Sequence, residues 1–211
     1  MFKAALFDLD GVVFDTEPQY SIFWSDVCRK YHPEQPGLEN KIKGQTLVEI
    51  LDGYFNYIPK AKEDILQGLD AYESQMNYLY VDGFSDFIKD IRQRGILTAL
   101  VTSSNIPKMR YVYEKHPEIK SCFDTILTAE DFKESKPSPD CYLQAAQRLK
   151  AMPSECVVFE DSFNGLRSGK AADMYVVGLS TTNTEEAISP FCNHVISDFS
   201  DFDFDKLTAL I

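Results

Sequence analysis

Two aspartates, Asp8 and Asp10, lie two residues apart at the end of an apolar run near the N-terminus, and Gly11 follows them. In an extended strand, residues two apart point to the same side, so both carboxylates would face one space. Acids this close repel each other, and both stay ionised only beside a cation. The pair suits a nucleophile, an acid/base partner and a shared divalent metal. Taken alone, it is more simply an acidic loop that caps a strand end or the next helix.

Hydroxyl and amide side chains follow a second apolar run, at Thr102, Ser103 and Asn105. Hydroxyls and free backbone N–H groups between a strand and a helix form a phosphate cradle, and the same atoms can instead cap the helix. Farther along, Lys136 precedes Pro137, which holds the lysine backbone out of a helix. Its ammonium could neutralise phosphate and carboxylate charge, although a lone lysine is more simply a solvated surface charge.

Two more acids, Glu160 and Asp161, end a third apolar run. Carboxylate oxygens are donors that suit Mg²⁺, and the alternative is that these acids cap a helix beginning at Ser162. Each of the four groups stands at the end of a predicted strand or in the loop after it. Ligands of open α/β sheets bind at the carboxyl ends of the strands, so the groups together predict one site.

The elements that must position these groups alternate between β-rich and amphipathic segments. Strands that alternate with helices predict an α/β fold with a Rossmann-like, doubly wound parallel sheet covered on both faces. Two of the expected helices span residues 84–94 and 139–150, the second with Ser138 as its N-cap. The expected strands span residues 3–9, 96–101, 125–128, 156–159, 174–179 and 194–196.

Residues 15–83 interrupt this alternation with helical patterns and no convincing strand. Their first helix face begins near Ile22, a second helix is expected over residues 46–57, and a third from Pro59 to about Leu79. An insert after the first strand would emerge at the ligand-binding edge of the sheet, where it could act as a lid. The predicted domains are an α/β core, residues 1–14 and 84–211, and an all-helical cap, residues 15–83.

Composition narrows the class of protein. The chain has 211 residues, with 21 Lys and Arg against 33 Asp and Glu, which gives a formal charge of −12. An acidic surface without a basic run repels a phosphate backbone, so nucleic acid is not an expected partner. No apolar stretch approaches the roughly 20 residues that span a bilayer, so no membrane association is expected. Five scattered cysteines without a C-x-x-C pair indicate reduced thiols in a cytoplasmic protein.

In this order, the four groups resemble the motifs of the haloacid dehalogenase-like (HAD) hydrolase superfamily, and the resemblance covers the whole chain. Residues 7–13 and 15–18 resemble its first motif and the start of its cap. Thr102 resembles the second motif, Lys136 the third, and the acids at 160 and 161 the fourth. Within the superfamily, the chain resembles the β-phosphoglucomutase-like and phosphatase branch, which carries a helical cap.

The resemblance implies a mechanism. Asp8 would attack phosphorus and become an aspartyl-phosphate, while Asp10 would protonate the leaving oxygen and then activate water. Mg²⁺ would be held by the Asp8 side chain, the Asp10 backbone carbonyl and Asp161, with Glu160 binding it directly or through water. The true haloacid dehalogenases of the superfamily lack an acid at the second position and use no Mg²⁺, so Asp10 favours phosphoryl transfer.

The resemblance also implies how the substrate is bound. Gly11, Thr102, Ser103 and Lys136 would bind the transferred phosphoryl group, the lysine through its charge. The partner would be a small phosphorylated metabolite, and the habit of the family favours a monomer.

A hexose-phosphate mutase of this branch must hold a second phosphate, with an arginine shortly after a cap glycine and a lysine from a later cap helix. Here Leu47 stands where the arginine would be expected, and residues 70–77 contain no lysine. The chain is therefore predicted to be a phosphatase that hydrolyses a small phosphate ester, with Lys43, Gln45 and Asn105 facing the substrate. The alternatives are a β-phosphoglucomutase-type mutase and, more remotely, a non-enzymatic phospho-aspartate signalling or binding protein.

Overall fold

The computed structural model describes residues 2–42 and 45–210, and the chain divides into two compact units. One unit is Met1–Asp15 with Tyr78–Ile211, and the other is Thr16–Asn77. The inserted unit ends before residue 83 because the segment after it pairs within the first unit. Val81 N donates to the Val13 carbonyl at 3.0 Å, and Asp15 N donates to the Leu79 carbonyl at 2.8 Å.

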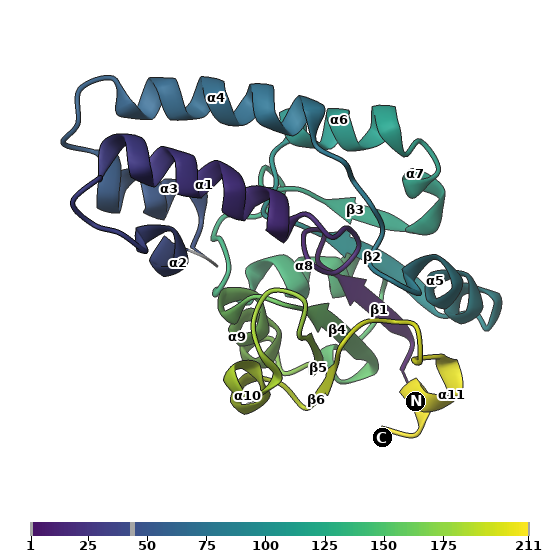
Figure 1. Ribbon diagram of the computed structural model, residues 1–211. Coiled ribbons are helices and arrows are strands. Elements are labelled where there is room, and N and C mark those ends of the chain that lie inside the picture. The colour runs from purple at the N-terminus through teal and green to yellow at the C-terminus, as the bar shows by residue number, and fades with distance from the viewer. Residues whose placement is uncertain (1, 43–44, 211) are drawn as a thin grey trace. The chain divides into compact units, whose positions relative to one another are not determined.

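Among the described residues, six strands form one parallel sheet in the order β3-β2-β1-β4-β5-β6 (Figure 1). The predicted α/β fold with a parallel sheet is therefore confirmed. Because β1 lies between β2 and β4, the residues that follow these three strands meet at one edge of the sheet. The strands are β1 (Ala4–Phe7), β2 (Leu97–Val101), β3 (Thr125–Leu127), β4 (Cys156–Glu160), β5 (Tyr175–Leu179) and β6 (His194–Ile196).

Helices α8 (Asp140–Arg148) and α9 (Phe163–Ala171) cover one face of the sheet. Tyr142 of α8 and Leu166 of α9 belong to one apolar cluster with Leu6 of β1 and Val158 of β4, and these four side chains are fully buried. Strand residues buried on both faces are the pattern that a parallel sheet between two layers requires.

The opposite face is covered by phenylalanines. Phe7 of β1 and Phe159 of β4 stack with their ring centroids 4.7 Å apart. Phe87 of α5 (Phe84–Gln93) and Phe199 of the C-terminal segment lie against them, with their own centroids 4.9 Å apart. The acidic C-terminal segment is therefore docked on the core through its aromatic residues.

The start of α8 differs from the prediction. Pro139, not Ser138, occupies the N-cap position, and it makes no side-chain capping bond. The helix therefore begins at Asp140, one residue later than predicted, and the Ser138 side chain still accepts from Asp140 N at 3.4 Å. The remaining helices of this unit are α6 (Ile106–Lys115), α7 (Ile119–Cys122), α10 (Glu185–Ile188), α11 (Phe204–Thr208) and two 3₁₀ turns (Pro153–Glu155 and Ser189–Phe191).

The unit Thr16–Asn77 is helical throughout its regular elements and has its own core. Phe23, Val27, Phe55 and Ile65 are buried within it and belong to one apolar cluster. None of the helices described for the chain is long and apolar enough to cross a membrane. The elements of this unit are α1 (Glu17–Tyr31), α2 (Leu38–Ile42), α3 (Leu47–Ile50), a π-helical turn (Leu51–Phe55) and α4 (Ala61–Gln75).

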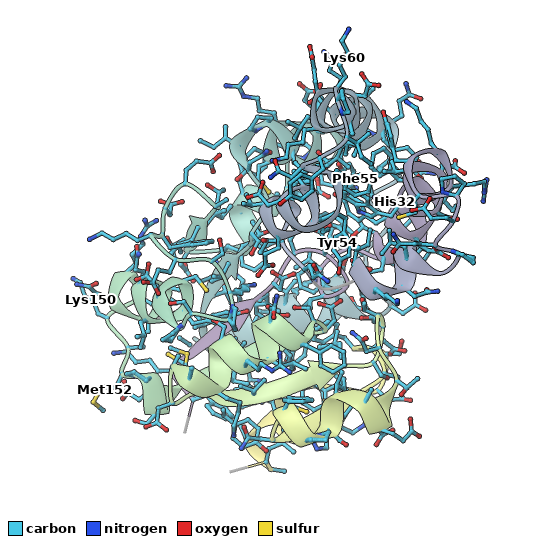
Figure 2. The ribbon with its side chains drawn as sticks, turned by 90° about the vertical axis from the view of Figure 1, so that its left-hand side faces the viewer. His32, Tyr54, Phe55, Lys60, Lys150 and Met152 are labelled. Carbon is cyan, nitrogen blue, oxygen red and sulfur yellow. The ribbon has the colours of Figure 1, made fainter. Side chains whose placement is uncertain are left out.

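The predicted helices of this unit need three corrections. The third helix begins at Ala61, not Pro59, because Lys60 takes a left-handed backbone conformation with φ of 62° at the N-cap. Lys60 is labelled in Figure 2. It also ends at Gln75, short of Leu79. The second helix is shorter than predicted and widens into the π-helical turn, which contains Gly53. The five-residue α2 was not predicted, because so short a helix shows no periodicity.

Candidate active site

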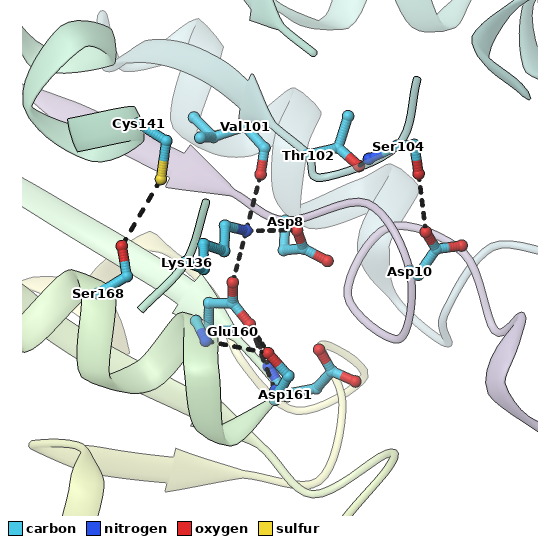
Figure 3. A network of polar contacts seen from close by, with 12 residues as sticks. Asp8, Asp10, Val101, Thr102, Ser104, Lys136, Cys141, Glu160, Asp161 and Ser168 are labelled. Carbon is cyan, nitrogen blue, oxygen red and sulfur yellow. Dashed lines mark hydrogen bonds and ion pairs between the residues drawn. The ribbon is translucent and has the colours of Figure 1, made fainter. Parts of the chain in front are cut away.

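The carboxyl ends of the central strands bring three charged side chains into contact (Figure 3). Lys136, in the loop before α8, donates from Nζ to Asp8 Oδ1 at 2.6 Å and to Glu160 Oε1 at 2.7 Å. It also donates to the Val101 carbonyl, the last of β2, at 3.0 Å. Asp8 follows β1 and Glu160 ends β4, so three predicted groups meet at one place.

Lys136 is enclosed, and the simpler interpretation of a solvated surface charge is wrong. Its side chain is only 4% exposed. Burial disfavours the charged ammonium, but the Asp8 and Glu160 carboxylates outweigh this and raise the pKa of Lys136 well above its usual range. The two carboxylates therefore favour the charged form of the lysine.

Asp8 lies in a site that is short of positive charge. Burial raises the pKa of Asp8 from its ordinary 3.8 to about 7, against the opposing Lys136, and the charges of Glu160 and Asp10 add to the rise. Asp8, Glu160 and Asp161 each offer a carboxylate oxygen, and these oxygens lie within 4.8 Å of one another. Hard oxygen donors within common reach and short of positive charge fit Mg²⁺.

Glu160 is bound on both of its oxygens. Oε1 accepts from Lys136 and from the Tyr142 hydroxyl at 2.8 Å. Oε2 accepts from Asp161 N at 3.1 Å and from the backbone and hydroxyl of Ser162. A direct metal bond would have to replace one of these contacts. These bonds hold Glu160 and Lys136 together, and the binding of a metal by Glu160, directly or through water, stays a prediction.

Gly11 allows the first and fourth motifs to approach each other. Its φ is +73°, and a Cβ there would lie 2.1 Å from Asp161 Oδ2, closer than any real contact. A side chain at this position would therefore displace the Asp161 carboxylate. The structure gives Gly11 this steric role, and its predicted contact with phosphate stays a prediction.

Asp10 belongs to a second group of polar side chains, apart from Lys136 in Figure 3. Its Oδ2 accepts from Ser104 Oγ at 3.1 Å and pairs with Lys108 Nζ at 2.5 Å. The Lys108 side chain is 5% exposed and that of Asp10 is 20% exposed. Sequence reasoning missed Ser104 and Lys108. The available signal was a lysine beside Met109, on the buried face of α6.

The three predicted residues of the loop after β2, Thr102, Ser103 and Asn105, have different surroundings. Thr102 is buried, and its Oγ1 accepts from Ser104 N at 3.0 Å, while Ser103 is exposed. Asn105 caps α6, since its side-chain oxygen accepts from Lys108 N at 3.0 Å. The capping alternative therefore holds for Asn105, and its predicted contact with substrate has no support in these bonds.

A second missed segment follows β5. Thr182 Oγ1 donates to Asp161 Oδ2, and Asn183 Nδ2 donates to the Asp161 carbonyl at 3.1 Å. Thr181 Oγ1 donates to the Gly11 carbonyl at 2.6 Å. The loop thus holds the residues after β1 and after β4 together. Its sequence signal, hydroxyl and amide side chains directly after an apolar strand, is the one that identified Thr102.

The predicted substrate residues of the helical unit lie in different circumstances. Gln45 Nε2 donates to the Lys41 carbonyl at 2.8 Å and to the Tyr54 hydroxyl at 3.3 Å, so it stabilises its own unit. Lys43 lies outside the described residues. Leu47, which stands where a mutase-type arginine would be expected, is the first residue of α3.

Comparison with known families places the chain. A family model described as haloacid dehalogenase-like hydrolase matches residues 2–173. The chain belongs to this family, and the resemblance inferred from its four motifs is confirmed. The protein is therefore a hydrolase of the HAD-like class.

Relatives agree with this placement. The bifunctional riboflavin kinase/FMN phosphatase of Arabidopsis thaliana is 29% identical over 97% of this chain but only 55% of its own length, so the chain spans about half of that relative. Hexitol phosphatase A of Escherichia coli (strain K12) is 31% identical over 84% of this chain and 83% of its own. Among solved structures, a β-phosphoglucomutase from Clostridium difficile shares the fold, with a TM-score of 0.80 and 22% identity over 100% of this chain and 97% of its own.

Proposed function

We propose that the protein is a Mg²⁺-dependent phosphatase that hydrolyses a small phosphate ester through an aspartyl-phosphate on Asp8. The observation that carries the proposal is the contact of Asp8 with Lys136, 2.6 Å apart, within reach of the Asp161 and Glu160 carboxylates. A carboxylate attacks an anionic phosphoryl group only where the repulsion between them is removed. Lys136 supplies one positive charge for this purpose.

The residues that would hold Mg²⁺ are the Asp8 side chain, the Asp10 backbone carbonyl and Asp161. When bound, the ion would supply positive charge beside the phosphoryl oxygens. Asp8 forms a bond to phosphorus while the bond to the leaving oxygen breaks and Asp10 gives that oxygen a proton. Water then attacks phosphorus, Asp10 takes its proton, and the bond between Asp8 and phosphorus breaks. Asp8 and Asp10 are both restored, and inorganic phosphate leaves.

Two observations support a sugar phosphate or a similar metabolite as the substrate. The names of the two curated relatives give them hexitol phosphatase and FMN phosphatase activity, so both act on phosphorylated small molecules. Leu47 offers no charge to a second phosphate, which disfavours the mutase reaction. The five unpaired cysteines fit the reducing cytoplasm as the place where the enzyme works.

The experiment is a panel of phosphate esters assayed for phosphate release with Mg²⁺ and with EDTA. Wild type should release phosphate only with Mg²⁺, and Asp8→Asn should release none. Asp201→Asn, which changes an exposed acid of the C-terminal segment, is the matched control and should act as wild type. β-Glucose 1-phosphate with a bisphosphate primer tests the mutase. The phosphatase is excluded if Asp8→Asn remains active or if hexose phosphates interconvert faster than phosphate appears.

A further inference from the structure

Lys108 is a buried cation for which the proposed reaction has no role. Its ammonium lies 2.5 Å from Asp10 Oδ2, and its side chain is 5% exposed. It shares the buried face of α6 with the apolar Met109 and Val112. A buried ammonium is costly unless it is paired with an anion. Its place in the fold is therefore tied to the Asp10 carboxylate.

The loop that carries Lys108 is itself ordered by hydrogen bonds. Thr102 Oγ1 accepts from Ser104 N at 3.0 Å, and the Asn105 side chain accepts from Lys108 N at 3.0 Å. These bonds set the positions of Ser104 and Lys108, which both bind the same oxygen of Asp10. Two donors on one oxygen restrict the orientation of a carboxylate more than a single donor does.

We propose that Lys108, together with Ser104, is a positioning residue for the acid/base carboxylate of Asp10. The inference rests on the proposed function and adds to it the two side chains that orient the Asp10 carboxylate. Proton transfer needs the carboxylate within hydrogen-bond reach of the leaving oxygen in the first step and of water in the second. In this role Lys108 acts through Asp10 alone and touches neither the substrate nor phosphorus.

The test compares two esters that differ in their need for an acid. When the P–O bond of a sugar phosphate breaks, the sugar leaves as an alkoxide that must be protonated. When the P–O bond of p-nitrophenyl phosphate breaks, p-nitrophenolate leaves as a stable anion. Misplacement of a catalytic group by about 1 Å costs about 10²-fold, so Lys108→Met should lose about 10²-fold in kcat/KM on the sugar phosphate. Its loss on the aryl ester should be at least about tenfold smaller, since no proton is needed there.

Matched variants complete the design. Lys108→Arg keeps a cation for Asp10 and should recover most of the sugar phosphate activity. Arg110→Met removes an exposed cation from the same helix and should behave as wild type on both esters. In an Asp10→Asn background, Lys108→Met should cost no more than about twofold further, because two residues that act through one group are not additive.

The outcomes distinguish a failure of the positioning role from a failure of the proposed function. Equal losses on the two esters, or full additivity with Asp10→Asn, would overturn the positioning role while leaving the phosphatase intact. No phosphate from either ester with wild type would instead end the proposed function, and this inference with it. If Lys108→Met does not fold, Ser104→Ala makes the same comparison, since it removes the second donor to Asp10 Oδ2.

Discussion

Lys136 and Lys108 each bind one aspartate of the Asp8–Asp10 pair, and their surroundings differ. Lys136 is enclosed with Glu160, whose side chain is 0% exposed, and it faces two carboxylates. Lys108 pairs with Asp10, whose side chain keeps 20% of its surface exposed. The first pair belongs to a network of three charges that is buried apart from Asp8, whose side chain is 14% exposed. In the second pair a single buried ammonium meets a carboxylate that reaches solvent.

The difference matches the two tasks proposed for the aspartates. A nucleophile must be held in one place beside a fixed positive charge, and enclosure strengthens that charge. An acid/base group must exchange a proton with substrate and water, which requires access. We therefore expect the Lys136 side to be sensitive in stability and activity alike, and the Asp10 side to be sensitive chiefly in proton transfer.

Removal of Lys136 should produce the largest effect. Lys136→Met would leave the Asp8 and Glu160 carboxylates buried together without a cation, which costs about 3–5 kcal/mol of unfolding free energy. Denaturant unfolding in EDTA measures this loss, and phosphate release should be undetectable. Lys108→Met should destabilise less, because Asp10 can be solvated. Equal destabilisation by the two variants would contradict the comparison.

Asp10→Asn should separate chemistry from metal binding. General acid/base help is typically worth about 10²–10⁴-fold, and kcat should fall by that factor. Affinity for Mn²⁺, followed by electron paramagnetic resonance, should stay unchanged because the proposed ligand at this position is the backbone carbonyl. Asp8→Asn should lose both activity and Mn²⁺ affinity. Hydrolysis by Asp10→Asn at the wild-type rate would remove Asp10 from the mechanism.

Thr182→Val should weaken metal binding without removing a ligand. The Thr182 hydroxyl donates to Asp161 Oδ2, and loss of such an outer contact typically costs about 10–100-fold in metal affinity. Thr182→Ser keeps the hydroxyl and should bind Mn²⁺ as wild type does. Thr181→Val, which loses only the bond to the Gly11 carbonyl, is the neighbouring control. Unchanged Mn²⁺ affinity in Thr182→Val would show that the hydrogen bond from Thr182 to Asp161 does not contribute to metal binding.

The raised pKa of Asp8, about 7, predicts a pH dependence on the Lys136 side. Below that pH, Asp8 of the metal-free folded protein holds a proton that the ion must displace. The apparent Kd for Mg²⁺ should therefore rise about tenfold for each pH unit by which the pH falls. Above it, the Kd should level off. Between about pH 4 and 7 the folded chain binds more protons than the unfolded chain, so stability in EDTA should fall as pH rises.

Calorimetric Mg²⁺ titrations and denaturant unfolding at pH 5, 6, 7 and 8 check both slopes. Asp8→Asn removes the titrating group and should flatten the stability curve in EDTA. An apparent Kd for wild type that does not change between pH 6 and 8 would show that Asp8 is already ionised there.

Much of the fold followed from local pattern. All six strands were predicted to within a few residues, because short apolar runs between turn residues are distinct along the chain. Helix starts were less predictable. Ser138 looked like a cap and Pro59 like a first-turn residue, yet backbone conformation nearby moved both helix starts along the chain.

The site divided in the same way. Asp8, Lys136, Glu160 and Asp161 could be brought together from the sequence because each follows or ends a strand of one parallel sheet. Tyr142 and Lys108 could not, since each is carried by a helix whose packing decides what it reaches.

By itself, the sequence determined the succession of strands and helices along the chain, the family and the acids proposed to carry its chemistry, because spacing and residue type act over a few neighbouring residues. Only the tertiary structure decided which cation serves which acid. Lys136 and Asp8, like Lys108 and Asp10, are far apart along the chain and 2.6 Å and 2.5 Å apart in space. Those pairings depend on how helices pack on the sheet, where burial makes each ammonium find a carboxylate.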